Sequence, residues 1–278
     1  MHHFELFTPH LLSSLTIHVH PSALPAQGVG LPPALHHLFQ KHLQEVTALV
    51  TRGAIFDGPV LAVRGIQHEG KNLLLEVQSS TYAPLSAARK AYLEAMDIGL
   101  LCTSRRADVP ALLGGSLCAA TIVLTADQRI LTTQRSARVS RARSFSLALG
   151  EVLEPKDVQE GGDFVRGVCA RTLEQELGLT LTPEQRASCL KPLHLLVTHD
   201  TGEWVFLVVA DFRGEGAAFS AARILQNASL AVDAWETENR SSEAYSEASL
   251  RAFLAAHAGH LAFWADGLVE LLLEELPP

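Results

Sequence analysis

Three positions on one predicted helical turn, 172, 175 and 176, have the spacing of a cation site. They lie in the stretch Arg171–Leu179, which reads RTLEQELGL. Residues three and four apart on an α-helix share a face, so side chains at these positions would point to one spot. Carboxylates gathered there would hold a hard divalent cation, Mg²⁺ or Mn²⁺, and activate a bound water. The spacing therefore suits a cation site.

Only one of the three positions carries a charge. Glu176 is a carboxylate, whereas Thr172 and Gln175 are neutral. Glu174 does not replace them, because it lies about 200° from Glu176 around the helix axis. A hydroxyl and an amide oxygen can still contact a metal or its waters, but affinity for Mg²⁺ falls as carboxylates are lost. We therefore predict metal-dependent chemistry that is weakened rather than excluded.

A capped helix flanked by strands must position these residues. It should run from about Asp163 to Leu177, with Asp163 as N-cap and Gly178 just beyond its end. The flanking predicted strands lie at 117–125, 130–136, 145–149 and, as a pair around a turn, 193–212. We expect a loop over 150–162, a polar loop after residue 212, and an apolar helical C-terminus broken near Gly259.

This order of elements, together with residues 150–179, resembles a Nudix domain and its signature, the Nudix box. The box reads G-x5-E-x7-R-E-U-x-E-E-x-G-U, where U is a bulky aliphatic residue. The residues in register with it are Asp163 (at the first Glu), Arg171, Leu173, Glu176, Gly178 and Leu179. Thr172 and Gln175 depart from it, and the loop before Asp163 is about six residues longer than the motif. The resemblance covers about residues 115–275 and implies an α+β fold, an α/β/α sandwich with a mixed sheet.

The first part of the chain has its own strand and helix signals. The strand LTIHVH, the helix PPALHHLFQKHLQEVTALV, a β-hairpin from GPVLAVRGI and KNLLLEVQS, and the helix APLSAARKAYLEAM follow one another. Two glycines in VPALLGGSL mark a boundary near residue 112, so we predict a smaller α+β domain over 1–112 and a Nudix-like domain over 113–278. The hairpin with STYAPLSAARK resembles the leader of a two-part Nudix subgroup related to hydrolases of uridine diphosphate glucose and galactose. That resemblance implies a nucleoside diphosphate sugar as ligand.

The resemblance also assigns the reactive positions. The residues implied to contact Mg²⁺ or Mn²⁺ are Glu176, Glu151 and Gln175. Glu151 belongs to the turn GEVLEP, where Nudix domains offer a backbone carbonyl to the metal. Glu176 and Glu236 are the implied catalytic residues, because a late Glu, here in DAWETEN, commonly serves as base or extra ligand. A surface carboxylate in a loop is the alternative for Glu151, and loop geometry leaves Glu236 open.

Ligand-binding positions lie on both sides of the turn. They are Arg135, Arg138, Gly150 and Arg171. Arg135 and Arg138 open a basic segment of four arginines within nine residues, and forked guanidinium groups of this kind clamp phosphates. The alternative is a solvated loop whose charge aids solubility.

Composition restricts the classes of partner. The chain of 278 residues has a net charge of −8; residues 1–112 carry 8 Lys/Arg and 8 Asp/Glu, and the remainder 14 and 22. This balance disfavours duplex nucleic acid. The sequence has neither a membrane-spanning run nor a signal peptide, so we expect a cytoplasmic protein without a membrane partner. Apolar C-terminal helices with Phe253, Leu261 and Trp264 would cover a second copy in a homodimer as easily as their own core.

Two functional hypotheses follow. The first is a Nudix-fold protein that binds a nucleoside diphosphate-linked ligand and whose metal-dependent hydrolysis is impaired by the degenerate box. The alternative is an active Mg²⁺- or Mn²⁺-dependent hydrolase of a nucleoside diphosphate derivative.

Overall fold

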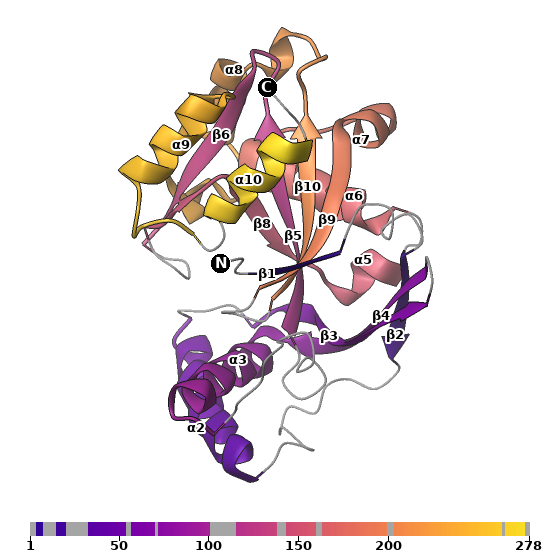
Figure 1. Cartoon of the computed structure of the whole chain (residues 1–278), viewed down its shortest axis with the longest axis vertical. Helices are drawn as coiled ribbons and strands as arrows, with labels where there is room; N and C mark the ends of the chain where they lie inside the picture. The colour runs from indigo at the N-terminus through magenta and orange to yellow at the C-terminus, as the bar shows by residue number, and fades with distance from the viewer. Residues whose placement is uncertain are drawn as a thin grey trace.

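A computed structural model describes residues 4–7, 15–20, 33–53, 57–69, 72–100, 115–137, 143–159, 163–198, 203–262 and 265–275 (Figure 1). The strands are β1 (Phe4–Phe7), β2 (Leu15–His20), β3 (Pro59–Glu69), β4 (Asn72–Thr81), β5 (Gly115–Leu124), β6 (Arg129–Arg135), β7 (Phe145–Ser146), β8 (Ala148–Val152), β9 (Leu190–Thr198), β10 (Trp204–Asp211) and β11 (Thr237–Ala244). The helices are α2 (Pro33–Thr51), α3 (Tyr82–Asp97), α5 (Pro155–Gln159), α6 (Phe164–Leu177), α7 (Pro183–Cys189), α8 (Ala221–Ala228), α9 (Glu247–Ala256) and α10 (Ala265–Glu275), with short 3-10 turns η2 (Ala217–Phe219) and η3 (Ala234–Glu236).

The strands form one mixed sheet. Its main path is β1-β9-β10-β5-β3-β4-β2, with β8 paired to β5 and with β6 joining β5, β7 and β11. The pairs β10–β5 and β2–β4 are parallel, while β9–β10, β3–β4 and β5–β8 are antiparallel. The α+β fold with a mixed sheet is therefore confirmed.

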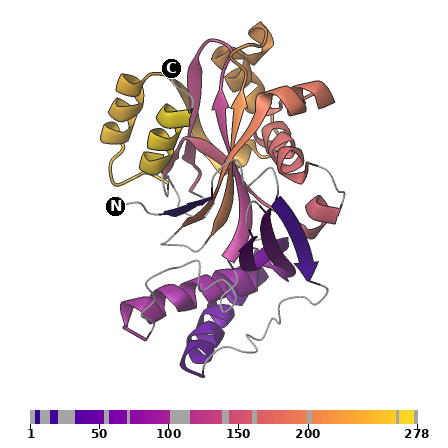
Figure 2. The same cartoon turned by 45° about the vertical axis from the view of Figure 1, so that its right-hand side comes forward.

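Central strand β5 has two buried faces because helices cover both sides of the sheet. Leu117 and Ala119 belong to the apolar cluster that contains the buried residues of α6, whereas Ile122 and Leu124 belong to the cluster that contains those of α9 and α10. Figure 2 shows the yellow helices α9 and α10 on one side of the strands and the salmon helices α6 and α7 on the other. This arrangement is the expected α/β/α sandwich. In the described part of the chain, no helix has the length and apolar character that a membrane crossing requires.

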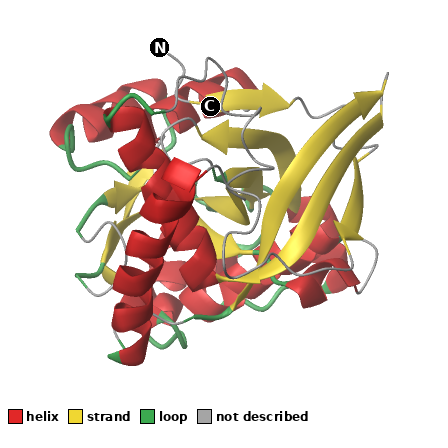
Figure 3. Cartoon of the chain, turned by 90° about the horizontal axis from the view of Figure 1, so that it is seen from below, coloured by secondary structure: helices red, strands yellow, loops and turns green. Residues whose placement is uncertain are grey.

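The predicted elements of the first part are present and continue the same sheet. Helices α2 and α3 pack through an apolar cluster that includes Phe39 and Tyr92. Strand β3 pairs with β5 through Ala62↔Ser116 and Val63↔Gly115. Seen from below, the long strands at the right of the view curve strongly (Figure 3). The predicted boundary near residue 112 lies outside the described residues, so the division at that point stays a prediction.

Two segments differ from expectation. The expected loop over 150–162 contains α5, because Pro155 opens a helical turn and the Asp157 carboxylate accepts a hydrogen bond from the Glu154 N–H at 2.8 Å. The polar stretch TENRSSEA, expected as loop, is strand β11, paired antiparallel with β6. Its polar composition concealed a strand that backbone pairing stabilises. Of the three C-terminal residues, Phe253 and Leu261 pack in the chain's own core, and Trp264 lies outside the described residues.

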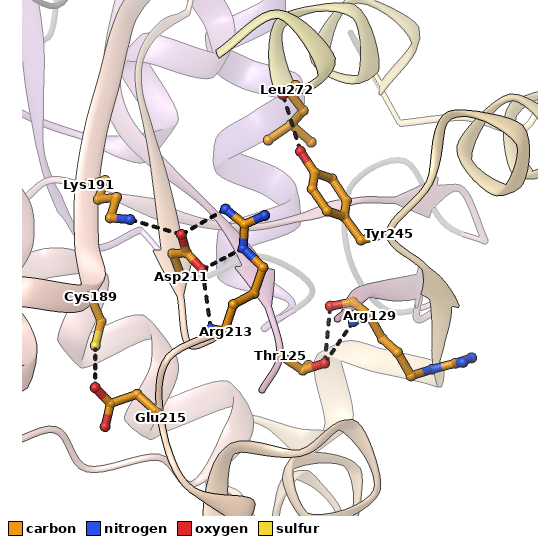
Figure 4. A network of polar contacts seen from close by, with 9 residues as sticks. All are labelled: Thr125, Arg129, Cys189, Lys191, Asp211, Arg213, Glu215, Tyr245 and Leu272. Atoms are coloured by element: carbon orange, nitrogen blue, oxygen red, sulfur yellow. Dashed lines mark hydrogen bonds and ion pairs between the residues drawn. The ribbon is translucent and has the colours of Figure 1, made fainter. Parts of the chain in front are cut away.

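A polar network surrounds Asp211, the C-terminal residue of β10 (Figure 4). The Asp211 carboxylate accepts hydrogen bonds from Lys191 Nζ at 2.8 Å and from the Nε and Nη2 atoms of Arg213 at 3.0 and 3.1 Å. The Arg213 guanidinium also lies 5.5 Å from the ring centroid of Tyr245, whose hydroxyl donates to the Leu272 carbonyl at 3.2 Å. The network thus connects β9, β10 and the helix α10.

Candidate functional site

Helix α6 has the caps that the sequence predicts. The Asp163 side chain accepts a hydrogen bond from the Arg166 N–H, and Gly178 adopts a left-handed conformation with φ of 65°. The Gly178 N–H donates to the Glu174 carbonyl at 2.9 Å. Glycine takes this conformation without steric cost. The buried apolar residues that seat the helix on the sheet include Val165, Val168, Cys169, Leu173 and Leu177.

The three positions of α6 that were predicted to share a cation-binding face, 172, 175 and 176, lie in different environments. Thr172 is fully buried, and its hydroxyl donates to the Val168 carbonyl at 3.0 Å. The expectation that Thr172 faces an open cation site is therefore corrected, because this hydroxyl is satisfied inside the helix. Gln175 is half-buried, and its backbone carbonyl accepts a hydrogen bond from the Asp233 N–H at 3.0 Å. Glu176 is buried, with 8% of its surface exposed.

Strand β8 brings Gly150 and Glu151 beside central strand β5, opposite Ala120 and Ala119. Gly150 is exposed, and a Cβ atom added there would meet nothing within 4 Å. Burial raises the pKa of the Glu151 carboxyl to about 7, and repulsion by Glu236 adds to the rise while Arg171 opposes it. Glu151 therefore changes charge near neutral pH.

Arg171 joins helix α6 to the turn that follows β8. Its guanidinium forms an ion pair with both oxygens of Asp157 and lies 3.8 Å from the Glu151 carboxylate. The in-register Asp163 forms its ion pair with Arg166 instead. Asp157, which the sequence analysis did not select, is thus the carboxylate that holds Arg171. An acidic residue two positions after Pro155, in the first turn of a helix, was the available signal.

Glu236 and Arg240, which follow α6 in the sequence, are two further charged residues near Glu176. Glu236 ends the turn η3, and its carbonyl accepts the Ser136 N–H at 2.8 Å, which holds η3 against the end of β6. Arg240 lies on β11 opposite Thr133 of β6. Sequence reasoning missed Arg240 because β11 was not recognised as a strand.

Charges of both signs meet around Glu176. Burial raises the pKa of its carboxyl to about 8; repulsion from Glu236 and Glu151 contributes, while Arg240 and Arg135 oppose the rise. Burial also raises the pKa of Glu236, and Asp233 adds to it. Burial lowers the pKa of Arg240, although Glu176 and Glu236 favour its charged form. The site therefore combines three carboxyl groups whose ionisation is disfavoured with two arginines.

A pocket of about 180 Å³ adjoins this region. Three of the predicted site residues line it, namely Arg135, Gly150 and Glu151. Its opposite wall comes from the first part of the chain and includes Tyr82, Ser86 and Arg89, all within the STYAPLSAARK segment. Arg89 forms an ion pair with Glu203, another lining residue, at 3.1 Å. The pocket therefore lies where the two predicted parts meet.

The oxygen-bearing side chains around Glu151 and Glu176 are not arranged to hold a divalent cation. Within the described ranges, no three His, Cys, Asp or Glu side chains are grouped so that they could hold a metal ion. The Glu151 carboxylate lies beside the Arg171 guanidinium, and the Thr172 hydroxyl donates a hydrogen bond to the Val168 carbonyl. The positive charge of Arg240 also acts on Glu176. Mg²⁺ requires closely placed oxygen ligands in near-octahedral geometry. The roles predicted for Glu176, Glu151 and Gln175 toward Mg²⁺ or Mn²⁺ stay predictions.

The predicted site residues fall in two groups. The first group lies among the described residues around α6, β8 and the end of β6, and its members are Arg135, Gly150, Glu151, Arg171, Gln175, Glu176 and Glu236. Arg138 lies outside the described residues. The predicted catalytic pair, Glu176 and Glu236, is close enough for each charge to influence the site, but neither residue lines the pocket.

Comparison with known proteins gives similarities of structure alone. No protein-family model and no curated protein matches the sequence. Among solved structures, a bifunctional NMN adenylyltransferase/ADP ribose pyrophosphatase from Francisella tularensis, complexed with AMP and a Mn ion, has a TM-score of 0.39 and 13% identity. That similarity covers 70% of this chain and 50% of the other, so it spans half the length of the bifunctional protein.

Two further structures carry Nudix descriptions. Tm1382, described as a candidate Nudix hydrolase, has a TM-score of 0.35 and 13% identity over 78% of this chain and 99% of its own. A MutT/nudix family protein from Enterococcus faecalis has a TM-score of 0.37 and 15% identity over 67% and 71% of the two chains. At these TM-scores and sequence identities, the similarities establish no function for this chain.

Proposed function

We propose that this chain binds a nucleoside diphosphate-linked ligand, with nucleotide sugars as the leading class, and that its metal-dependent diphosphate hydrolysis is impaired. The observation that carries the proposal is the pocket, because Arg135, Gly150 and Glu151 meet Arg89 and Tyr82 there. These residues come from segments far apart in the sequence. A concave, largely apolar site with a few converging polar groups is the usual form of a small-molecule site.

The lining suits the separate parts of such a ligand. Val60, Leu85 and Val205 provide apolar surface for a base or the face of a sugar ring. Arg89 and Arg135 provide guanidinium groups, which complement phosphate oxygens. A volume of about 180 Å³ is below the roughly 300–1,000 Å³ of drug-sized ligand sites. The pocket therefore accommodates one ring of the ligand, and the rest must extend beyond it.

The impaired hydrolysis rests on the donor set. Glu176 is the only carboxylate among the three box positions on α6, and Thr172 uses its hydroxyl within the helix.

One observation favours an active Mg²⁺- or Mn²⁺-dependent hydrolase as a second candidate function. Glu151, Glu176 and Glu236 are near enough for repulsion between them to raise the pKa of Glu176. A cation that entered this region would relieve that repulsion.

Binding should be measured by calorimetry with a panel of nucleoside diphosphates and nucleoside diphosphate sugars. We expect Arg135→Gln to weaken binding at least tenfold, because the pocket loses a phosphate-complementing charge. The matched control is Arg143→Gln, since Arg143 is an exposed neighbour of the same segment that does not line the pocket. Equal losses in the two variants, or no binding by the wild-type protein, would contradict the proposal.

Hydrolysis of the same panel with Mg²⁺ or Mn²⁺ separates the two candidate functions. Gln175→Glu adds a carboxylate beside Glu176 at a half-buried position, so we expect it to gain turnover over wild type. Thr172→Glu is unsuitable because Thr172 is fully buried. Fast wild-type turnover that Glu176→Gln abolishes, while the control Glu174→Gln preserves it, would establish the active hydrolase instead. Glu174 is exposed on the same helix.

A further inference from the structure

Three arginines of the C-terminal part differ in what occupies one edge of the guanidinium group, the edge formed by Nε and Nη2. In Arg213, this edge donates to the two carboxylate oxygens of Asp211, at 3.0 and 3.1 Å (Figure 4). In Arg129, the same edge donates to the hydroxyl and the carbonyl of Ser242, at 2.8 and 2.5 Å. Both arginines thus place two acceptor oxygens on this edge.

Arg240 has the same edge without an acceptor. Its Nη1 atom donates to the Ala234 carbonyl at 3.5 Å, which anchors the guanidinium to the turn η3. Its Nε and Nη2 atoms are buried from solvent and have no hydrogen-bond partner among the residues that the structure describes. Buried donors of a charged group are nearly always satisfied in native proteins, so an empty pair requires an explanation.

The strand register places Arg240 on the same face as a residue that lines the proposed ligand site. Arg240 lies opposite Thr133, and Arg135 lies two residues beyond Thr133 on β6. Alternate residues of a strand share a face, and directly opposite residues share it too. Arg240 and Arg135 are therefore on the same face of the β6–β11 pair, and Arg135 lines the pocket.

We propose that the Nε–Nη2 edge of Arg240 binds an oxyanion of the ligand, namely a phosphate of its diphosphate. The identity of that ligand rests on the proposed function. A planar fork with two parallel donors matches two phosphate oxygens, as it matches the two oxygens of Asp211 in Arg213. Arg240 and Arg135 together supply two positive charges on this face.

The test compares Arg240→Lys with Arg129→Lys in the chain of 278 residues. Lysine keeps the positive charge and removes the fork in both variants. Arg129 lies on the same strand pair and has its edge filled by Ser242, so its variant controls for the loss of a guanidinium from this sheet. The probe is inorganic pyrophosphate, measured by calorimetry without divalent metal. We expect Arg240→Lys to weaken pyrophosphate binding at least tenfold and Arg129→Lys to leave it within twofold.

The outcomes separate this inference from the proposed function. Equal pyrophosphate affinity in wild type and Arg240→Lys, or no pyrophosphate binding by wild type, overturns the role of Arg240. Binding of pyrophosphate through Arg240 without binding of any nucleoside diphosphate supports that role and overturns the proposed function. If Arg240→Lys does not fold, a crystal structure of wild type with pyrophosphate decides. An anion on the Nε–Nη2 edge supports the inference, and an anion elsewhere overturns it.

Discussion

Asp211 and Glu176 are two carboxyl groups with opposite electrostatic surroundings. Asp211 is half-buried as a residue and its side chain is 7% exposed, whereas Glu176 is a buried residue. Burial opposes ionisation of Asp211, but hydrogen bonds from Arg213 and Lys191 outweigh it and hold its pKa well below the usual range. Burial dominates at Glu176 and raises its pKa to about 8.

The contrast distinguishes a carboxylate whose charge stabilises the fold from a carboxyl group whose ionisation opposes folding. The donors of Arg213 and Lys191 satisfy Asp211 within the chain (Figure 4). Around Glu176, Glu236 and Glu151 repel it, and two donors of Arg240 have no acceptor. Titratable groups with disfavoured charge cluster at functional sites more often than elsewhere. The comparison therefore favours the proposed ligand-binding role for the region around Glu176 and a structural role for Asp211.

The largest effect is expected from Asp211→Asn, which should lower the free energy of unfolding by about 3 kcal/mol at pH 7, because a hydrogen-bonded buried charge is lost. The folded-state pKa of Asp211 is depressed, so its contribution is present above its unfolded pKa of about 3.8 and is lost as pH falls below that value. Urea unfolding between pH 3 and 7 should show the variant and wild type converging in acid. A constant difference across this range would break the comparison.

Glu176→Gln should have the opposite sign. The folded-state pKa of about 8 lies above the ordinary value of 4.5, so ionisation destabilises the fold increasingly as pH rises from 4.5 to 8. We expect the variant to be more stable than wild type by on the order of 2 kcal/mol at pH 8.5 and equal to it near pH 4. Thermal and urea unfolding in EDTA would measure this. Loss of stability in the variant at pH 8.5 would make Glu176 a structural residue like Asp211.

A smaller effect is expected from Arg213→Lys, which keeps the charge beside Asp211 and removes the two-pronged contact. The loss should be about 1 kcal/mol, close to the value of one hydrogen bond. Urea unfolding at pH 7 would measure it, with Arg251→Lys as the control because Arg251 forms exposed ion pairs with Glu247 and Glu270. A loss equal to that of Asp211→Asn would show that the fork itself, rather than the charge, stabilises this region.

Much of the fold follows from local sequence signals. Helix α6 and its caps at Asp163 and Gly178 were predictable because a side-chain acceptor and a glycine act within a few residues of the helix ends. The strands around it were predictable from their apolar patterns. Strand β11 was not, because its residues are polar and its stability comes from pairing with β6. Helix α5 was hidden for a related reason, since it is a single short turn fixed by Asp157.

The site was predictable in part. Spacing on one helix singled out Glu176, whose predicted metal and catalytic roles stay predictions; in the structure it lies near other charged groups. The same spacing placed Thr172 on the face that would meet a metal, whereas packing buries it. Helical periodicity defines which residues share a face, and it does not define what covers that face. Asp157 was missed because α5 was not recognised as a helix, and Arg240 was missed because β11 was not recognised as a strand.

The sequence by itself determined the helix α6, its capping residues and the absence of charge at positions 172 and 175, because each depends on residue type and local spacing. Only the tertiary structure decided that Arg89 of α3 shares a pocket with Arg135 and Glu151, and that the Nε–Nη2 edge of Arg240 is left without an acceptor. These relations arise where β3, β5, β6, β8 and β11 meet in one sheet. Such meetings depend on long-range packing, which no short stretch of sequence encodes.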